Sequence, residues 1–387
     1  MSALCFAISI IGWALLLCAA LGTLYMALAT RILARFFGQR QSMPSRTEPV
    51  TLLKPLYGDE PRLAENLASF LDQDHAGPIQ LLLGVHRADD AAIPAVRALQ
   101  ARFPQARIDL VINDIRHGAN GKISNLINMM PQAAHETLIL SDSDMAVDRD
   151  YVTRIVTALD DPDVGAVSCV YRGRGDAGFW SQLGAAGLSW QFLPGAVFGT
   201  ALKLARPCMG STIALRRTTL DRVGGFTAFA DKLADDYAIG EAVHALGLAV
   251  AIPPMLVVHG SAERSFNELW RHELRWGATV RDVVPVAYAM GVIGIPLPLA
   301  LLGLLIHPLP GAILTLAALT VRLNLAVTAD KIAGARTAPL WWLPMRDCLT
   351  MGVFIASLFV RRVDWRGTAL NMGSDGRVAV HSETAPS

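Results

Sequence analysis

The sequence has 387 residues, of which 52% are hydrophobic and 17% are charged. This composition is too apolar for an ordinary soluble enzyme and too charged for a bundle of membrane helices alone, so we expect both parts in one chain. A net charge of +1, without a basic run that carries interleaved aromatic residues, argues against nucleic acid as a partner. The five cysteines stand singly and form no CxxC pair, which indicates neither a disulfide framework nor a zinc site.

The chain opens with an apolar stretch, residues 3–29, that carries no charged side chain. About 20 apolar residues span a bilayer, so residues 1–30 are predicted to form a transmembrane anchor. A cleaved signal peptide has its basic residues before a shorter apolar core, whereas here they follow it, which favours an uncleaved anchor. These basic residues are Arg31, Arg35, Arg40 and Arg46. By the positive-inside bias, the basic linker 31–49 and the domain after it are predicted to lie in the cytoplasm.

Residues 50–282 alternate between short β-rich runs and helical stretches. The expected strand and helix pairs are 50–53 with 63–71, 79–85 with 91–102, 108–112 with 122–130, and 137–140 with 151–159. This alternation predicts an α/β domain with a mainly parallel sheet and helices on both faces. In such sheets ligands bind at the carboxyl ends of the strands, which is where chemistry should be sought.

Residues 283–362 are apolar again and are predicted to hold membrane segments. Residues 283–306 and 309–329 are each long enough to cross a bilayer and are separated by two residues, which predicts a helical hairpin whose first arm is bent by prolines. The third segment, 340–360, contains Arg346 and Asp347 and has basic residues on both sides. This pattern favours a segment that re-enters the membrane or lies in its interface.

Residues 363–387 form a polar tail. From Asn371 onward we expect this tail to lack regular structure, because it has few apolar residues with which to form a core.

Two carboxylates directly follow the apolar run 138–140. Asp142 and Asp144 are two residues apart, so in an extended chain they share a face and can converge on one hard cation. Their oxygen ligands suit Mg²⁺ or Mn²⁺, which would bridge phosphate oxygens. The alternative is a solvent-exposed turn, since Asp and Ser are common in turns.

Three further motifs carry acidic or basic groups near expected strand or helix ends. Asp89 or Asp90, after the run 79–85, can accept a hydrogen bond from a nucleobase, or can cap the next helix. Lys122, beside Gly121, can approach a phosphate, or can be an ordinary surface lysine. A carboxylate of the pair Asp235 and Asp236 can take a proton from a hydroxyl group, or the pair can cap the following helix.

The last motif is 271–276, Arg-His-Glu-Leu-Arg-Trp, just before the membrane segments. Basic residues beside a membrane commonly bind lipid headgroups, and this alternative is strong for Arg271. Arg275 has a second possible role, which is to stabilise a leaving diphosphate, while Trp276 packs against a sugar or an acceptor.

Taken in chain order, these motifs resemble the ceramide glucosyltransferase family, a branch of the processive-type GT-A glycosyltransferases. That family is marked by three spaced Asp motifs followed by (Q/R)xxRW, and the resemblance covers residues 50–370. The matching positions are 50–58 with Lys54 for the N-terminal donor strand, Asp89 or Asp90 for the first Asp, Asp142-Ser143-Asp144 for the second, Gly210-Ser211 for a small-residue loop facing the donor, Asp236 for the third Asp, and Arg275-Trp276 for the RW pair.

The resemblance implies a GT-A (nucleotide-diphospho-sugar transferase) fold and an inverting transfer from a UDP-sugar to a lipid that enters from the bilayer. It implies catalytic roles for Asp236 as base, Arg275 and Trp276, and Mg²⁺ or Mn²⁺ held by Asp142 and Asp144. The implied donor-binding residues are Lys54, Asp89, Asp90, Lys122, Asp142, Gly210 and Ser211. Asp235 and His272 are expected on the acceptor or leaving-group side. His272 departs from the family pattern, because it stands where Gln or Arg is expected.

The chain is most similar to the bacterial branch associated with hopanoid biosynthesis. This likeness implies transfer of N-acetylglucosamine, or glucose, to a hopanoid polyol by a multi-pass protein of the bacterial inner membrane whose catalytic domain faces the cytoplasm. Glucosylation of ceramide is the alternative. A polysaccharide synthase usually has more spanning helices, and a transporter or scaffold should show internal repeats that this sequence lacks.

Overall fold

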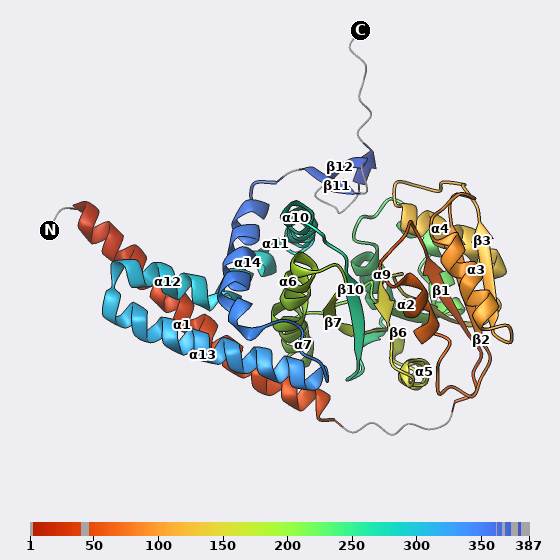
Figure 1. Ribbon diagram of the computed structural model, residues 1–387, viewed down its shortest axis with the longest axis horizontal. Helices are drawn as coiled ribbons and strands as arrows, with labels where there is room; N and C mark the ends of the chain where they lie inside the picture. Colours follow the sequence, from red (N-terminus) through yellow and green to blue (C-terminus); the bar gives the residue numbers. More distant parts are fainter. Residues whose placement is uncertain (1–2, 40–45, 361, 366–367, 373–377, 381–387) are drawn as a thin grey trace, which may run out of the picture.

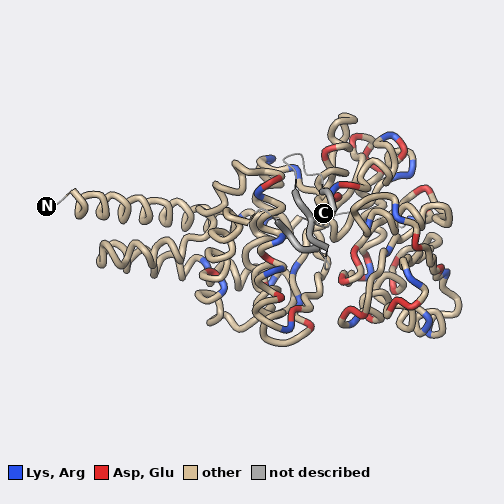
Figure 2. The backbone as a smooth tube through the Cα atoms, turned by 90° about the horizontal axis from the view of Figure 1, so that it is seen from above, with Lys and Arg blue, Asp and Glu red and all other residues tan. Residues whose placement is uncertain are grey.

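The computed structural model of the chain describes residues 3–39, 46–360, 362–365, 368–372 and 378–380. Figure 1 shows an α/β part at one end and an elongated group of helices, with the N-terminus, at the other. Figure 2 shows that charged residues gather on the α/β part and on the helices next to it, whereas the far end of the helical group carries almost none. The mixed composition thus reflects two parts with different surroundings.

The main sheet has seven strands in the order β3-β2-β1-β4-β8-β6-β9. β1 pairs in parallel with β2 and β4, and β2 with β3, while β8 runs antiparallel between β4 and β6. The strands are β1 Val50–Pro55, β2 Ile79–Val85, β3 Arg107–Ile112, β4 Thr137–Leu140, β6 Val164–Ser168, β8 Ile213–Arg216 and β9 Ala249–Ala251. The predicted α/β domain with a mainly parallel sheet is confirmed.

A second sheet of three strands lies beside the first and brings distant parts of the chain together. β10 pairs in parallel with β7 and antiparallel with β5. The strands are β5 Met145–Ala146, β7 Val170–Gly175 and β10 Leu256–Ser261. The register places His259 opposite Met145, so β10 runs directly beside the segment that holds Asp144.

Four helices of the α/β part, α2 to α5, begin and end close to the predicted positions, and the others had no predicted bounds. The helices of this part are α2 Leu63–Ser69, α3 Ile93–Arg102, α4 Gly121–Met129, α5 Tyr151–Leu159, α8 Arg217–Arg222 and α9 Asp235–Ala245, with the short 3-10 helices η1 Met130–Gln132 and η3 Phe226–Phe229. α3 begins two residues later than predicted, because Asp90 accepts a hydrogen bond from the Ala92 backbone at 2.9 Å and the chain turns there first. At α4 the Asn120 side chain accepts from the Ile123 backbone and fixes the first turn.

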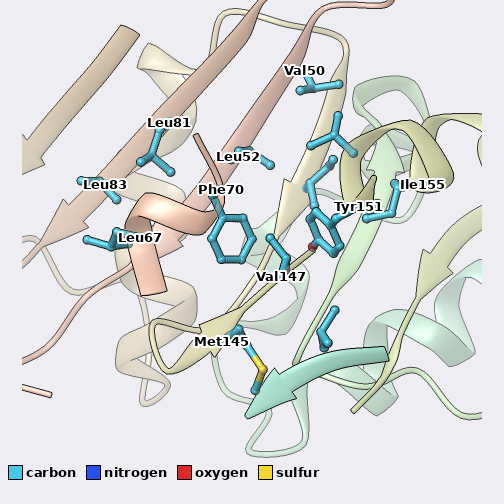
Figure 3. Close-up of a cluster of buried hydrophobic side chains, with 14 of the residues drawn as sticks. Val50, Leu52, Leu67, Phe70, Leu81, Leu83, Met145, Val147, Tyr151 and Ile155 are labelled. Carbon is cyan, nitrogen blue, oxygen red and sulfur yellow. The ribbon is translucent and has the colours of Figure 1, made fainter. Parts of the chain in front are cut away.

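Buried apolar side chains between the sheet and helices α2 and α5 form the core shown in Figure 3. Phe70 and Tyr151 meet edge to face with ring centroids 5.5 Å apart. Burial of each such side chain contributes about 1.5–3 kcal/mol. This core fixes β1 and β4 side by side, so the residues that follow their carboxyl ends have defined positions.

Among the residues that the structure describes, two helices are long and apolar enough to cross a membrane, α1 Ala3–Phe37 and α13 Pro308–Ile332. Residues 285–294 and 296–306 are together long and apolar enough for a third span, but these two halves are bent by 63° relative to each other. These halves are α11 Pro285–Met290 with the 3-10 helix η4 Gly291–Gly294, and α12 Pro296–Ile306. The bend predicted from the prolines is present. α1 runs on to Phe37, so the helix extends beyond the predicted anchor, residues 1–30, into the basic linker.

Helices between the two parts connect the sheet to this membrane group. They are α6 Phe179–Gly187, the π-helix η2 Leu188–Phe192, α7 Leu193–Ala201, α10 Phe266–Val283, the 3-10 helix η5 Leu340–Trp342 and α14 Leu343–Ser357. Figure 1 shows α14, α10 and α6 side by side in the middle of the molecule, and these helices contact one another. α14 has 15 residues, fewer than the about 20 that a membrane span needs.

The C-terminal tail is more regular than expected. Its described residues form an antiparallel sheet of β11 Arg362–Trp365, β12 Thr368–Met372 and β13 Val378–Val380. The expectation of a tail without regular structure from Asn371 is therefore wrong for residues 371–372 and 378–380. Backbone pairing between short apolar runs stabilises strands here even though the composition is polar.

Candidate active site

Asp142 and Asp144 follow the carboxyl end of β4, the position that the sequence predicted. Asp142 Oδ1 lies 2.7 Å from Lys122 Nζ. The Asp144 backbone oxygen accepts a hydrogen bond from the Gly260 backbone at 2.9 Å, which ties this segment to β10. The carboxylates are therefore held at the edge of the sheet by contacts from α4 and from the second sheet.

Lys122 links two of the predicted acidic residues, Asp142 and Asp235. Its Nζ lies 3.3 Å from Asp235 Oδ2 as well as 2.7 Å from Asp142. Burial lowers the pKa of Lys122, but the nearby charges of Asp142 and Asp235 outweigh this effect, so the pKa is raised overall and the ammonium stays charged. Asn120 adds a hydrogen bond from Nδ2 to Asp235 Oδ1 at 3.2 Å. The structure thus gathers Lys122, Asp142 and Asp235 from three separate elements.

Asp236 and Gly210 complete this group. The Gly210 N–H donates to Asp236 Oδ2 at 3.0 Å, and the Tyr237 N–H donates to Oδ1 at 2.8 Å. Burial and the neighbouring charge of Asp235 raise the pKa of Asp236 from 3.8 to about 6. A Cβ atom added at Gly210 would lie 3.2 Å from Asp142 Oδ2 and 3.5 Å from Asp236 Oδ2. Gly210 therefore leaves space open between two carboxylates, as its place in a small-residue loop predicted.

Lys54 and Ser211, both predicted to bind a donor, are turned inward instead. Lys54 is fully buried, and its Nζ donates to Ser141 Oγ at 3.1 Å and to the Asp142 backbone oxygen at 2.7 Å. Burial lowers the pKa of Lys54 to about 7, although nearby Asp residues oppose this shift. Ser211 is 3% exposed and donates to the Cys169 backbone oxygen at 2.8 Å. Both side chains thus hold the loops at the sheet edge, and their contact with a donor stays a prediction.

The two candidates for the first Asp differ in their surroundings. Asp89 is exposed and pairs with Arg87 at 2.6 Å on the surface. Asp90 accepts hydrogen bonds at 2.9 Å from the backbones of Gly58 and Ala92. Because Gly58 follows the end of β1, Asp90 is the member of the pair that joins the loops at the sheet edge. This geometry favours Asp90 and leaves Asp89 on the outside.

His259 belongs to the site although the sequence analysis did not select it. Its Nε2 lies 3.4 Å from Asp144 Oδ2, and its Nδ1 is buried without a partner in the described chain. Its ring stacks on Tyr171 and meets the edge of Trp276 with centroids 5.9 Å apart. The only signal in the sequence was a single histidine at the end of a strand, which by itself is usually a core residue.

The RW pair lies on α10, next to His272. Trp276 lies between two imidazoles, since its ring centroid is 5.9 Å from that of His259 and 4.4 Å from that of His272. His272 Nδ1 is hydrogen-bonded to Glu263 Oε1. Arg275, between them in sequence, is half-buried. Trp276 therefore contacts both His259, which lies beside Asp144, and His272. The role of Arg275 at a diphosphate stays a prediction.

The donor atoms of this site fit a divalent cation. Asp144 Oδ1 is buried and has no hydrogen-bond partner in the described chain, and Asp142 stands two residues before it, after the end of β4. Carboxylate oxygens with an imidazole nearby suit Mn²⁺ or Mg²⁺. No group of three or more His, Cys, Asp or Glu is arranged for a metal among the described residues. Mg²⁺ is often held by one or two carboxylates together with substrate phosphates, and Asp142 and Asp144 match that case.

A cavity of about 580 Å³ opens beside Trp276, between the α/β part and the membrane helices. Its walls come from α6, η2, α7, α10, α11 and α14. Most of its lining is apolar, including Leu188, Phe192, Leu269, Val280, Val353 and Phe354. Met209, the neighbour of Gly210, also lines it, so the cavity reaches the loop that separates the carboxylates.

Comparisons with known proteins agree with this arrangement. Residues 14–378 match the family model described as glycosyl transferase family 21. Ceramide glucosyltransferase 3 of Caenorhabditis elegans is 25% identical over 241 residues, which cover 59% of this chain and 49% of that protein. An N-acetylglucosaminyltransferase of Bradyrhizobium elkanii is 29% identical over 123 residues, which cover 30% of this chain and 63% of that protein. The chain thus spans about half the length of the ceramide glucosyltransferases of Caenorhabditis elegans that it matches.

Among solved structures, the mannosyltransferase PcManGT from Pyrobaculum calidifontis, in complex with GDP-Man and Mn²⁺, matches with a TM-score of 0.53 and 20% identity. The match covers 91% of this chain and 99% of that chain, so the two share a glycosyltransferase fold. Because the family model extends over most of the sequence, from the first membrane helix to the C-terminal tail, the chain belongs to glycosyl transferase family 21.

Proposed function

We propose that the chain is a membrane-bound, inverting glycosyltransferase that moves a sugar from a UDP-sugar to a lipid hydroxyl group. One observation carries this proposal, namely that Gly210 separates the carboxylates of Asp142 and Asp236 and that its neighbour Met209 lines a largely apolar cavity. The carboxylate group suits a nucleotide diphosphate with its cation, and the cavity suits the apolar body of a lipid.

In the proposed step the acceptor oxygen forms a bond to the anomeric carbon while the bond from that carbon to the UDP oxygen breaks. The bonding electron pair leaves with UDP, and the hydroxyl proton passes to Asp236. With a pKa of about 6, Asp236 is ionised at neutral pH and is more basic than an ordinary aspartate. A base of this kind commonly contributes about 10²–10⁴-fold to the rate.

Lys122 and Arg275 are the cations that we assign to the leaving diphosphate. Lys122 forms ion pairs with Asp142 and Asp235. The negative charge of a phosphate group can attract its ammonium away from these carboxylates. Asp142 and Asp144 would hold Mg²⁺ or Mn²⁺, which supplies further positive charge against the diphosphate when it is bound. We assign Asp90 to the nucleobase end, because it follows β2 and its carboxylate accepts a hydrogen bond from Gly58 in the loop after β1.

For the substrates, we propose N-acetylglucosamine as the sugar, with glucose as the alternative, and a hopanoid polyol as the acceptor. Ceramide is the alternative acceptor. Relatives named ceramide glucosyltransferase and N-acetylglucosaminyltransferase support either sugar, whereas the hopanoid acceptor rests on the resemblance of the sequence alone. We also propose that the protein lies in the bacterial inner membrane with its α/β part in the cytoplasm, because α1 ends beside basic residues.

The test is to incubate the purified protein with UDP-glucose or UDP-N-acetylglucosamine against ceramide or a hopanoid polyol, and to identify products by mass spectrometry. We expect a glycosylated hopanoid, and UDP release that increases when the acceptor is added. Glucosylceramide as the sole product would overturn the proposed acceptor. UDP release that no lipid stimulates, at any divalent cation concentration, would refute lipid glycosylation itself.

A further inference from the structure

The cavity wall contains a hydrogen-bonded pair, Glu263 and His272, that the proposed transfer step does not use. Glu263 lies between β10 and α10, and His272 is in the second turn of α10. Both side chains line the cavity, and the Trp276 ring lies between His272 and His259, the histidine beside Asp144. The pair is therefore one aromatic ring away from the reacting centre.

The hydrogen bond between the pair fixes which nitrogen of His272 is open to a ligand. A carboxylate accepts hydrogen bonds, so the Nδ1 atom that contacts Glu263 carries the hydrogen of the neutral ring. The other nitrogen, Nε2, is then an acceptor, and it has no hydrogen bond within the described chain. The side chain is 26% exposed, and the edge-to-face contact with Trp276 limits rotation of the ring.

Glu263 has a second open atom. It is only 8% exposed, and its Oε2 is buried without a hydrogen-bond partner in the part of the chain that the structure describes. A buried carboxylate oxygen without a donor is unfavourable, so the position calls for a donor from a ligand or water. A Cβ at Gly184 would lie 3.5 Å from Oε2 and 3.0 Å from Leu269 Cδ1, so a side chain at this position would crowd the carboxylate.

The charged residues at this end of the cavity favour a neutral ligand. Arg346 lines the cavity, but both terminal nitrogens of its guanidinium already bond to the Glu273 carboxylate, at 2.5 and 2.6 Å. The open atoms of Glu263 and His272 are both acceptors. A phosphate head would meet carboxylates and no free cation among these lining residues, whereas a hydroxyl or amide group can donate to both open atoms.

We propose that Glu263 and His272 bind the head of the acceptor lipid through hydrogen bonds that the acceptor donates, and so select a neutral head that carries hydroxyl or amide donors over an anionic one. This inference rests on the proposed transfer to a lipid. His272 contacts the acceptor through Nε2, and Glu263 both orients that ring and offers Oε2. Residue 272, where the sequence departs from the (Q/R)xxRW pattern, is thereby a determinant of the acceptor.

Three variants test the pair against one control. His272→Asn keeps an amide where Nδ1 meets Glu263 but has no atom at the position of Nε2. We therefore expect the acceptor KM to rise about 10-fold, which corresponds to the loss of one hydrogen bond. Glu263→Ala should have a larger effect, of about 100-fold in kcat/KM for the acceptor, because two hydrogen bonds are lost. Glu263→Gln keeps an acceptor for Nδ1 and should restore part of that loss. The control is His135→Asn, before β4 and far from its carboxyl end.

Binding of UDP with Mn²⁺, measured by calorimetry, should stay within about two-fold of wild type in every variant, because the pair contacts the acceptor only. An acceptor KM that is unchanged in both His272→Asn and Glu263→Gln would overturn the inference even if Glu263→Ala fails to fold. If the wild-type protein glycosylates no lipid, the proposed function fails instead, so the two failures are distinguishable.

Competition tests the chemical class. In nanodiscs, a monoacylglycerol with free hydroxyl groups should inhibit transfer, and the inhibition should weaken in His272→Asn. Phosphatidic acid of the same chain length should inhibit less than the monoacylglycerol. Stronger inhibition by phosphatidic acid that persists in the variant would overturn selection for a neutral head.

Discussion

Replacement of Asp236 by Asn removes the proposed base but keeps the size of the side chain. An amide cannot take the acceptor proton, so we expect transfer to the lipid to fall by about 10²–10⁴-fold. Asn can still accept the Tyr237 N–H through its remaining oxygen, whereas its NH₂ group then faces the Gly210 N–H. UDP binding should therefore weaken far less than the transfer rate.

The same substitution is expected to leave the fold as stable or more stable at neutral pH. A raised carboxyl pKa means that the folded chain binds the proton more tightly than the unfolded chain, so the stability that this gives is present below pH 3.8 and lost as the pH rises through about 6. The difference between the pKa of Asp236 in the folded and the unfolded chain destabilises the fold by about 3 kcal/mol at neutral pH, and Asn avoids this cost. The Gly210 N–H that loses its acceptor opposes this gain by about 1–3 kcal/mol. The net change is a gain of up to about 2 kcal/mol.

Two assays check this prediction. Wild-type kcat/KM for the acceptor should fall about 10-fold per pH unit below about pH 6, and the variant should show no such limb. Thermal unfolding in detergent should favour the variant more at pH 8 than at pH 4.5. The control is Asp221→Asn on exposed α8. Transfer by Asp236→Asn at near the wild-type rate would refute the base assignment, and an equal loss of stability at both pH values would refute its burial as a charged group.

Three further outcomes are expected. Exhaustive chelation should abolish transfer. Asp144→Asn should raise the Mn²⁺ concentration for half-maximal activity by about 10-fold or more, because one buried oxygen that we propose as a metal ligand is lost. Full activity after chelation would show that transfer needs no metal. Gly210→Ala places a Cβ 3.2 Å from Asp142 Oδ2 and should raise the donor KM about 10-fold, measured by UDP-sugar titration; an unchanged donor KM would contradict this. Asp347→Asn leaves buried Arg322 without its carboxylate and should cost about 3–5 kcal/mol, seen as a thermal midpoint lower by about 5 °C or more; an unchanged midpoint would contradict this.

The first half of the α/β part could be predicted closely because its strands are apolar runs bounded by turn residues. β2, β4 and α5 have the predicted bounds. The second half has no such alternation. β5 has two residues and depends on pairing with β10 for its existence, so no local pattern announces it. The antiparallel strand β8 also depends on both of its neighbours.

Asp90, Asp142 and Asp144 could be selected from the sequence because they follow strands β2 and β4, whose carboxyl ends lie at one edge of the sheet. Asp235 and Asp236 follow no strand and stand in the first turn of α9. Burial could not be predicted in the same way. Lys54 and Ser211 stand in motifs that we predicted to face a donor, and their polar atoms bond to the backbone of neighbouring segments. His259 and Glu263 carry no motif of their own, and they enter the site only because β10 lies beside Asp144 and α10 follows it.

The charged residues within the third apolar segment, 340–360, form ion pairs with other helices. Asp347 forms two hydrogen bonds with Arg322 of α13, at 2.6 and 2.9 Å, and neither side chain is exposed. Arg322 Nη1 also donates to the Trp190 backbone oxygen at 2.7 Å, which attaches the same pair to η2. The charges thus hold α14 against a membrane helix and against the π-helix at once.

Arg346, the next residue back, attaches α14 in the opposite direction. It bonds to Glu273 of α10 and lines the cavity together with Thr350. Separating the partners of a buried ion pair leaves a buried charge uncompensated, which strongly destabilises the folded protein. These contacts therefore fix the separation of α10, α14 and η2. That separation is the width of the acceptor cavity. The membrane helices therefore do more than anchor the enzyme that we propose, since they set the shape of the space in which its lipid acceptor is bound.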